Sequence, residues 1–170
     1  MVNRDPVTSV LHAEIALNRE QVFRWWSDDA RQQEGRTRLQ RLPVRDFTWE
    51  ESSGPSGFVD SYVATWITRL DVSVRVHCSR FIVSDSAFRT ETFAERHYRN
   101  GLIQTTTISS AFDFSEQGAD STALELTTIW QATELSWWEY LPRAHRRRVA
   151  HIEQHHLKAN MARCLAECLP

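Results

Sequence analysis

A long run of strand-like segments, followed by one long amphipathic segment, constrains this chain most. Between residues 39 and 132, stretches rich in β-branched and aromatic residues alternate with turn residues. Residues 135–169 instead have apolar residues at helical spacing. Strands with one apolar face must cover that face, and the terminal segment is the only large element available to do so. The pattern predicts an α+β domain in which a C-terminal helix covers an antiparallel sheet.

Seven strands are expected, joined in the middle of the chain by short turns. The strongest turn signal is Asn100-Gly101, a dipeptide typical of β-hairpins. Consecutive strands with short connections form an antiparallel meander. The expected strands are residues 10–17, 39–50, 58–70, 71–83, 87–98, 102–114 and 121–132.

Two short helices are expected between the first two strands. Asn18 is a helix N-cap residue for residues 19–26, and Gln21 stands at the capping-box position. A second helix is expected from Ser27 through Gln33. The chain therefore begins with a strand and two short helices before the meander.

Composition bounds the class of protein. A length of 170 residues fits one domain, residues 1–170, and 41% hydrophobic with 25% charged residues is ordinary for a soluble globular protein. Seven Trp residues favour a wide, aromatic-lined interior. A net charge of -2 excludes a general basic field for nucleic acid. No apolar window reaches the length of a membrane span, so no membrane insertion is expected.

The cysteines and the polar first residues indicate the compartment. Cys78, Cys164 and Cys168 are odd in number and show no disulfide framework, which favours reduced thiols. Residues 1–6 do not resemble a secretory signal. A cytoplasmic location is expected.

The order of elements resembles that of a known superfamily. The strand 12–17 and the run 18–28, with its small polar residue, Glu, Val and aromatic residues, lead into the first helix, and residues 135–169 form a long C-terminal helix. This arrangement resembles the helix-grip fold of the START and Bet v allergen-like (SRPBCC) superfamily, in particular its polyketide cyclase/dehydrase-like branch. The resemblance implies a curved seven-stranded sheet wrapped around the terminal helix, with a ligand cavity between them. It implies no single function, because this fold hosts carriers, cyclases and receptors.

Polar residues interrupt the apolar side of the terminal helix. Glu153, His156 and Asn160 are three and four residues apart, so they are neighbours on one helix face. Together they would offer a carboxylate, an imidazole and an amide to one ligand, and a His–Glu pair could transfer a proton. Two alternatives are open: the helix is rotated by about 40°, which puts Glu153 and His156 at a wet margin, or these residues bond polar atoms in the core.

Aromatic and aliphatic residues on the last two strands share the expected inward phase. Trp130 is in phase with Leu126, and Phe112 is in phase with Phe114. Ordinary core packing is the alternative for each of them. For residues 58–70 the alternation does not show which face is inward. The candidate ligand-binding residues are Phe112, Phe114, Leu126, Trp130, Val149, Ile152, Glu153, His156 and Asn160, and the candidate catalytic residues are His156 and Glu153.

Other features favour no cofactor. His151 and His155 have an i, i+4 spacing that can bind a metal, but no third ligand is evident. No metal or other cofactor is expected. The arginines of residues 143–148 form a solvated face or bind an anion. For Trp137 and Trp138 three roles are open: a hydrophobic gate at the helix entrance, a contact in a homodimer, or packing at the start of the helix.

Three functions are compatible with these features. The first is a carrier or sensor of a small hydrophobic molecule, whether aromatic, polycyclic or lipid-like. The second is an aromatase/cyclase-type enzyme acting on a polyketide-like substrate. The third is a protein-interaction module that uses the outer face of the terminal helix. Whether the chain is an enzyme is open at this stage.

Overall fold

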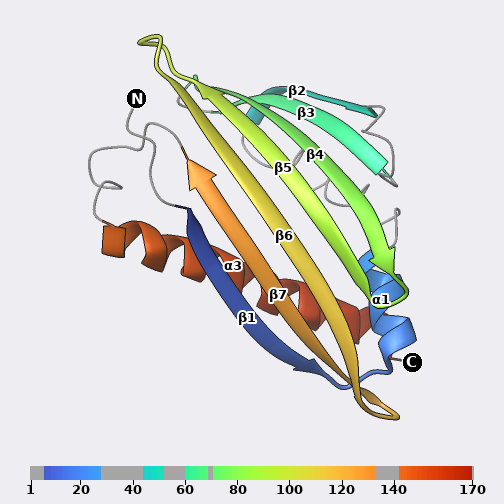
Figure 1. Ribbon diagram of the computed structural model, residues 1–170. Helices are drawn as coiled ribbons and strands as arrows, with labels where there is room; N and C mark the ends of the chain where they lie inside the picture. The colour runs from blue at the N-terminus through green and yellow to red at the C-terminus, as the bar shows by residue number, and fades with distance from the viewer. Residues whose placement is uncertain (1–5, 28–43, 52–59, 69–70, 133–141, 170) are drawn as a thin grey trace.

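The computed structural model describes residues 6–27, 44–51, 60–68, 71–132 and 142–169. Seven strands and two helices lie in these ranges (Figure 1). Their bounds are β1 Val7–Ile15, α1 Arg19–Ser27, β2 Val44–Glu51, β3 Asp60–Thr68, β4 Ser73–Ser84, β5 Ala87–His97, β6 Ile103–Gly118, β7 Ser121–Ala132 and α3 Pro142–Cys168.

All seven strands form one antiparallel sheet. Their spatial order is β1-β7-β6-β5-β4-β3-β2, so β2 to β7 form a meander and β1 pairs with the last strand. The predicted seven-stranded antiparallel sheet is confirmed. The Asn100-Gly101 turn is confirmed too: Gly101 has a φ of 81°, and the Asn100 Oδ1 accepts a hydrogen bond from the Leu102 N–H at 3.1 Å.

The first helix begins as the sequence predicts. The Asn18 Oδ1 accepts a hydrogen bond from the Gln21 N–H at 2.9 Å, which satisfies one of the free N–H groups of the first turn. The second predicted short helix extends through residues 28–33, which lie outside the described residues. The same is true of residues 135–141, the predicted start of the terminal helix, which include Trp137 and Trp138.

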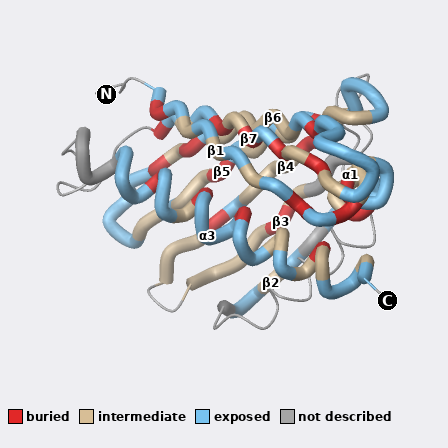
Figure 2. Tube along the Cα trace, turned by 90° about the horizontal axis from the view of Figure 1, so that it is seen from below, coloured by how far each residue is buried: buried red, intermediate tan, exposed pale blue. Residues whose placement is uncertain are grey.

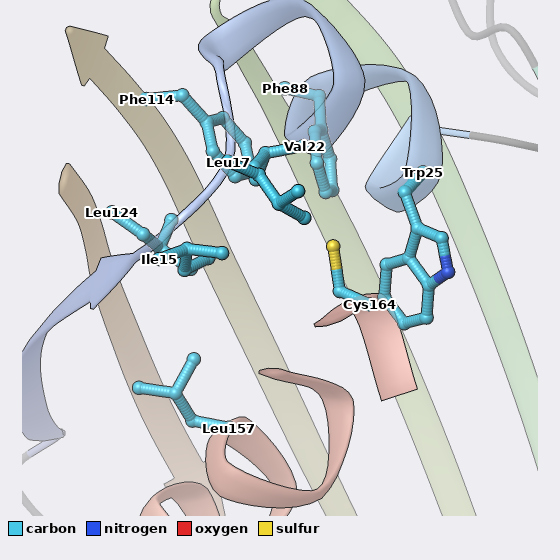
Figure 3. Close-up of a cluster of buried hydrophobic side chains, with 9 residues drawn as sticks. All are labelled: Ile15, Leu17, Val22, Trp25, Phe88, Phe114, Leu124, Leu157 and Cys164. Carbon is cyan, nitrogen blue, oxygen red and sulfur yellow. The ribbon is translucent and has the colours of Figure 1, made fainter. Parts of the chain in front are cut away.

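A compact apolar cluster lies where α1, the C-terminal half of α3 and four strands meet (Figure 3). Phe23 of α1 packs edge-on against Phe88 and Phe114, at centroid distances of 6.3 and 5.8 Å. The Trp25 Nε1–H donates to Glu167 Oε2 at 3.0 Å, which ties α1 to α3. The buried members are Ile15, Leu17, Val22, Trp25, Phe88, Phe114, Leu124, Leu157 and Cys164.

Helix α3 is much narrower than the sheet that it covers. Strands about 4.8 Å apart make a seven-stranded sheet roughly 30 Å wide, whereas a helix with its side chains is about 10 Å across. The helix packs mainly against β1 and α1, and Figures 1 and 2 show the sheet curving around it. Inward side chains of the middle strands are accordingly only half-buried, among them Val76, Thr92 and Ile108.

The apolar cluster can be tested by comparing a buried and an exposed residue of β7. Leu124→Ala is expected to lower the free energy of unfolding by about 2–5 kcal/mol, because it leaves a cavity in a fully buried site. Ile129→Ala, five residues along the same strand, is 42% exposed and should cost less than about 1 kcal/mol. Urea unfolding followed by circular dichroism measures both. Equal losses would show that the cluster does not anchor the fold.

Candidate functional site

Strand β7 presents every second side chain to the helix. Leu124, Leu126 and Thr128 are buried, Trp130 in the same phase is half-buried, and Ile129 of the opposite phase is exposed. The predicted inward phase of Leu126 and Trp130 is therefore confirmed. Their role in ligand binding stays a prediction.

Strand β6 presents Phe112 and Phe114 to the same side. Phe112 stacks on Phe88, with ring centroids 4.4 Å apart and an interplanar angle of 14°. Phe114 is 4% exposed and belongs to the apolar cluster at α1. Both face inward as predicted. Phe112 is half-buried, and it is closer along β6 to the half-buried inward residue Ile108 than Phe114 is.

Helix α3 turns Val149, Glu153 and Leu157 towards the sheet. All three are buried, and Ile152 and Asn160 beside them are half-buried. Figure 2 shows buried positions recurring along the sheet-facing side of α3, with exposed segments between them. Val149 and Glu153 are buried as predicted, and Ile152 and Asn160 are half-buried.

His156 departs from the predicted position. It is exposed, and its ring lies edge-on to that of the exposed His155, with centroids 6.2 Å apart. The buried side of the helix centres on Glu153, Leu157 and Cys164, and at 100° per residue His156 lies roughly 80° away from that centre. His156 thus does not share the buried side with Glu153, and the adjacency expected from the spacing alone is corrected.

The Glu153 carboxylate is the central polar group of the site. Its residue is 9% exposed. Oε1 accepts a hydrogen bond from the Trp130 Nε1–H at 2.9 Å, and Oε2 lies 3.4 Å from the Thr128 hydroxyl. A carboxylate can accept about four hydrogen bonds, so two donors from the described residues leave it able to accept more.

A short chain of hydroxyl groups continues from this carboxylate. The Thr128 Oγ1 lies 3.4 Å from Glu153 Oε2 and also 3.4 Å from the Ser110 Oγ. The Thr128 hydroxyl has one hydrogen and can donate only once. When it donates to the carboxylate, its oxygen is left to accept from Ser110, so the two strands and the helix meet in one polar network.

Sequence reasoning missed Thr128, placed Ser110 in the inward phase without naming it as a site residue, and left strand β3 undecided. Their signal was their phase: Thr128 alternates with Trp130, and Ser110 alternates with Phe112. For β3, Ala64 is 1% exposed, so its face is the inward one, and Trp66 shares it. A tryptophan of β3 thus joins the concave side.

A metal site, a membrane-spanning helix or a surface depression among the described residues would also bear on function. No three His, Cys, Asp or Glu side chains in the described part of the chain are placed to hold a metal ion. Neither described helix combines the length and the apolar character of a membrane span. A surface depression of about 620 Å³ is lined by outward-facing His12, Glu14, Asp113 and Glu125, on the sheet face opposite to Glu153.

The chain is similar to known proteins in its fold. No protein-family model matches the sequence, and no curated protein does either. Among solved structures, a START superfamily protein from Mycobacterium smegmatis is 13% identical with a TM-score of 0.57, over 92% of this chain and 96% of that one. The chain has the helix-grip fold of the START and Bet v allergen-like superfamily.

Two further structures support the assignment of the fold. The Zhui aromatase/cyclase from a Streptomyces species is 11% identical with a TM-score of 0.60, over 96% of this chain and 93% of that one. A protein from Thermus thermophilus is 17% identical, also with a TM-score of 0.60, over 95% of this chain and 99% of that one. At these identities the similarity concerns the helix-grip fold alone.

The hydrogen bonds of the Trp130 and Trp25 indole groups lead to a second prediction. Trp130→Phe removes a donor from the buried Glu153 carboxylate and is expected to cost about 1–3 kcal/mol beyond the loss of ring area. Trp25→Phe removes the same type of bond from Glu167, which is exposed and can bond to water instead. Urea unfolding measures both losses. Because Trp25 is buried in the apolar cluster and also loses ring contacts there, the result that would contradict the central role of Glu153 is a loss below about 1 kcal/mol for Trp130→Phe.

Proposed function

We propose that the protein binds a small hydrophobic molecule, aromatic or polycyclic, between the sheet and α3, with Glu153 as its polar anchor. One observation carries the proposal: a buried carboxylate with unused acceptor capacity lies in a largely apolar wall. Burying a charged group is costly unless hydrogen bonds compensate it. A ligand donor that completes these bonds would offset that cost.

The surrounding side chains suit an aromatic ligand. Trp130 and Phe112 are half-buried aromatic groups on the concave face, and Val149 and Ile152 of α3 lie beside Glu153 on the helix. Asn160 adds a half-buried amide nearly two turns from Glu153. Phe114 is packed in the apolar cluster, so we assign it the role of supporting the wall rather than touching the ligand.

The mismatch in width supports the place of binding. One helix cannot fill the concave side of a sheet roughly 30 Å wide. Val76, Thr92 and Ile108 of the middle strands face inward and are only half-buried, so there is room over them. A bound molecule in that room would cover apolar surface that α3 does not reach.

A second candidate is an enzyme of the aromatase/cyclase kind. The observation that favours it is again the unused acceptor capacity of Glu153, because a positioned carboxylate can take a proton from a substrate. The hydroxyls of Thr128 and Ser110 would then hold the carboxylate and a substrate oxygen in place. His156 is exposed and leaves Glu153 as the candidate base.

Titration with N-phenyl-1-naphthylamine tests the binding proposal. This neutral aromatic amine fluoresces in apolar surroundings and carries one N–H donor for Glu153. We expect saturable fluorescence, and a rise in Tm that grows with probe concentration because the probe stabilises the folded state by linkage. Glu153→Gln should weaken binding by about fivefold, since a charged acceptor forms the stronger hydrogen bond.

Gln154→Ala is the matched control. Gln154 is the exposed neighbour of Glu153 on the same helix, so its loss should leave the affinity unchanged. Circular dichroism confirms that each variant is folded. Probe fluorescence that does not saturate, or equal weakening by both substitutions, would contradict a site anchored by Glu153.

A further inference from the structure

One polar row crosses the concave face of the sheet. Residues paired directly across antiparallel strands lie on the same face, and the register connects five strands through such pairs: Ser9 with Thr128, Thr128 with Ser110, Ser110 with Thr90, and Thr90 with Arg80. The row is thus Ser9, Thr128, Ser110, Thr90 and Arg80, on β1, β7, β6, β5 and β4.

The rows on both sides of it are largely apolar. On the side of α1 lies the row Leu11, Leu126, Phe112 and Phe88. On the other side lies the row Val7, Trp130, Ile108, Thr92 and Cys78, in which the Thr92 hydroxyl bonds to the Cys78 sulfur at 3.4 Å. The polar row is therefore a stripe of hydroxyl groups between two surfaces on which an aromatic ring can lie.

Thr128 and Arg80 of the stripe are occupied, and the part of the stripe between them is open. Thr128 is fully buried beneath Glu153. Arg80 is 2% exposed, and its Nη1–H donates to the Ser27 carbonyl oxygen at 2.7 Å. Ser110 and Thr90 between them are half-buried, and within the described part of the chain the Thr90 hydroxyl makes no hydrogen bond.

We infer, resting on the proposed function, that the ligand is a flat, elongated aromatic molecule with a polar group at each end. One end donates a hydrogen bond to Glu153, and the other end meets the Thr90 hydroxyl. Strands lie about 4.8 Å apart, so β7 and β5 are about 10 Å apart, and that is the required separation of the two polar groups. The long axis of the molecule runs along the stripe, across the strands.

The charges at the two ends give the ligand a direction. The Glu153 carboxylate only accepts hydrogen bonds, so the group beside it must be a donor. At the other end, Thr90 can donate, and the positive charge of Arg80, its directly paired neighbour, favours an oxygen that carries partial negative charge. A phenolic hydroxyl meets both requirements, since it donates and accepts.

A series of three biphenyls tests the inference by displacement of N-phenyl-1-naphthylamine. The oxygens of 4,4′-dihydroxybiphenyl are about 10 Å apart, as two strand spacings require, whereas 4-hydroxybiphenyl has one oxygen and biphenyl none. We expect the diol to bind about fivefold more tightly than the mono-ol, because it makes one more neutral hydrogen bond. Thr90→Val should abolish that preference and leave the affinity for the mono-ol unchanged.

Two control variants keep the result interpretable. Thr90→Ser retains the hydroxyl and should retain the preference for the diol. Thr107→Val removes a hydroxyl from the exposed face of β6 and should change nothing. Equal affinity of the wild-type protein for diol and mono-ol, or a preference that survives Thr90→Val, would overturn the inference while leaving the proposed function standing. Failure of the amine and of all three biphenyls to bind would instead overturn the proposed function.

Discussion

A single helix has to cover the concave side of seven strands, and the rest of the structure follows from that mismatch. At one end, α1 and the C-terminal half of α3 close an apolar cluster that includes Val22, Leu124 and Cys164. Beyond that end α3 alone faces the sheet, and one helix is too narrow to cover all seven strands. Side chains such as Ile108 and Trp130 face inward there and yet remain half-buried. Packing is thus complete at the cluster and incomplete over the middle strands, where we propose that the ligand binds.

Glu153 lies at the boundary between these two regions. Leu157 and Cys164, which follow it along α3, belong to the apolar cluster, and this packing sets the rotation of the helix about its axis. The same rotation aims the Glu153 carboxylate at the Trp130 indole and the Thr128 hydroxyl. The site is therefore a consequence of core packing about one to three turns away along α3, and not of an independent loop.

The candidate site could be predicted from the sequence in part. The alternation in residues 121–132 is local, and it correctly predicted the inward phase of Leu126 and Trp130. Helical spacing also placed Glu153 among apolar residues. It failed for His156, because spacing gives the angle between two residues but not which side of the helix the rest of the protein covers. It was silent on β3, where both faces carry apolar residues, and the burial of Ala64 decided the question.

The sequence by itself determined the strands, the Asn100-Gly101 turn, the Asn18 cap and the polar interruption of the terminal helix. Each of these depends on residues within a few positions of one another, so backbone periodicity and turn chemistry are sufficient. The tertiary structure alone decided that Thr128, Ser110 and Thr90 lie side by side in one row that passes beneath the Glu153 carboxylate. Strand register and helix rotation result from contacts between segments far apart in the chain, and a slip of one residue would turn every hydroxyl of that row to the outer face.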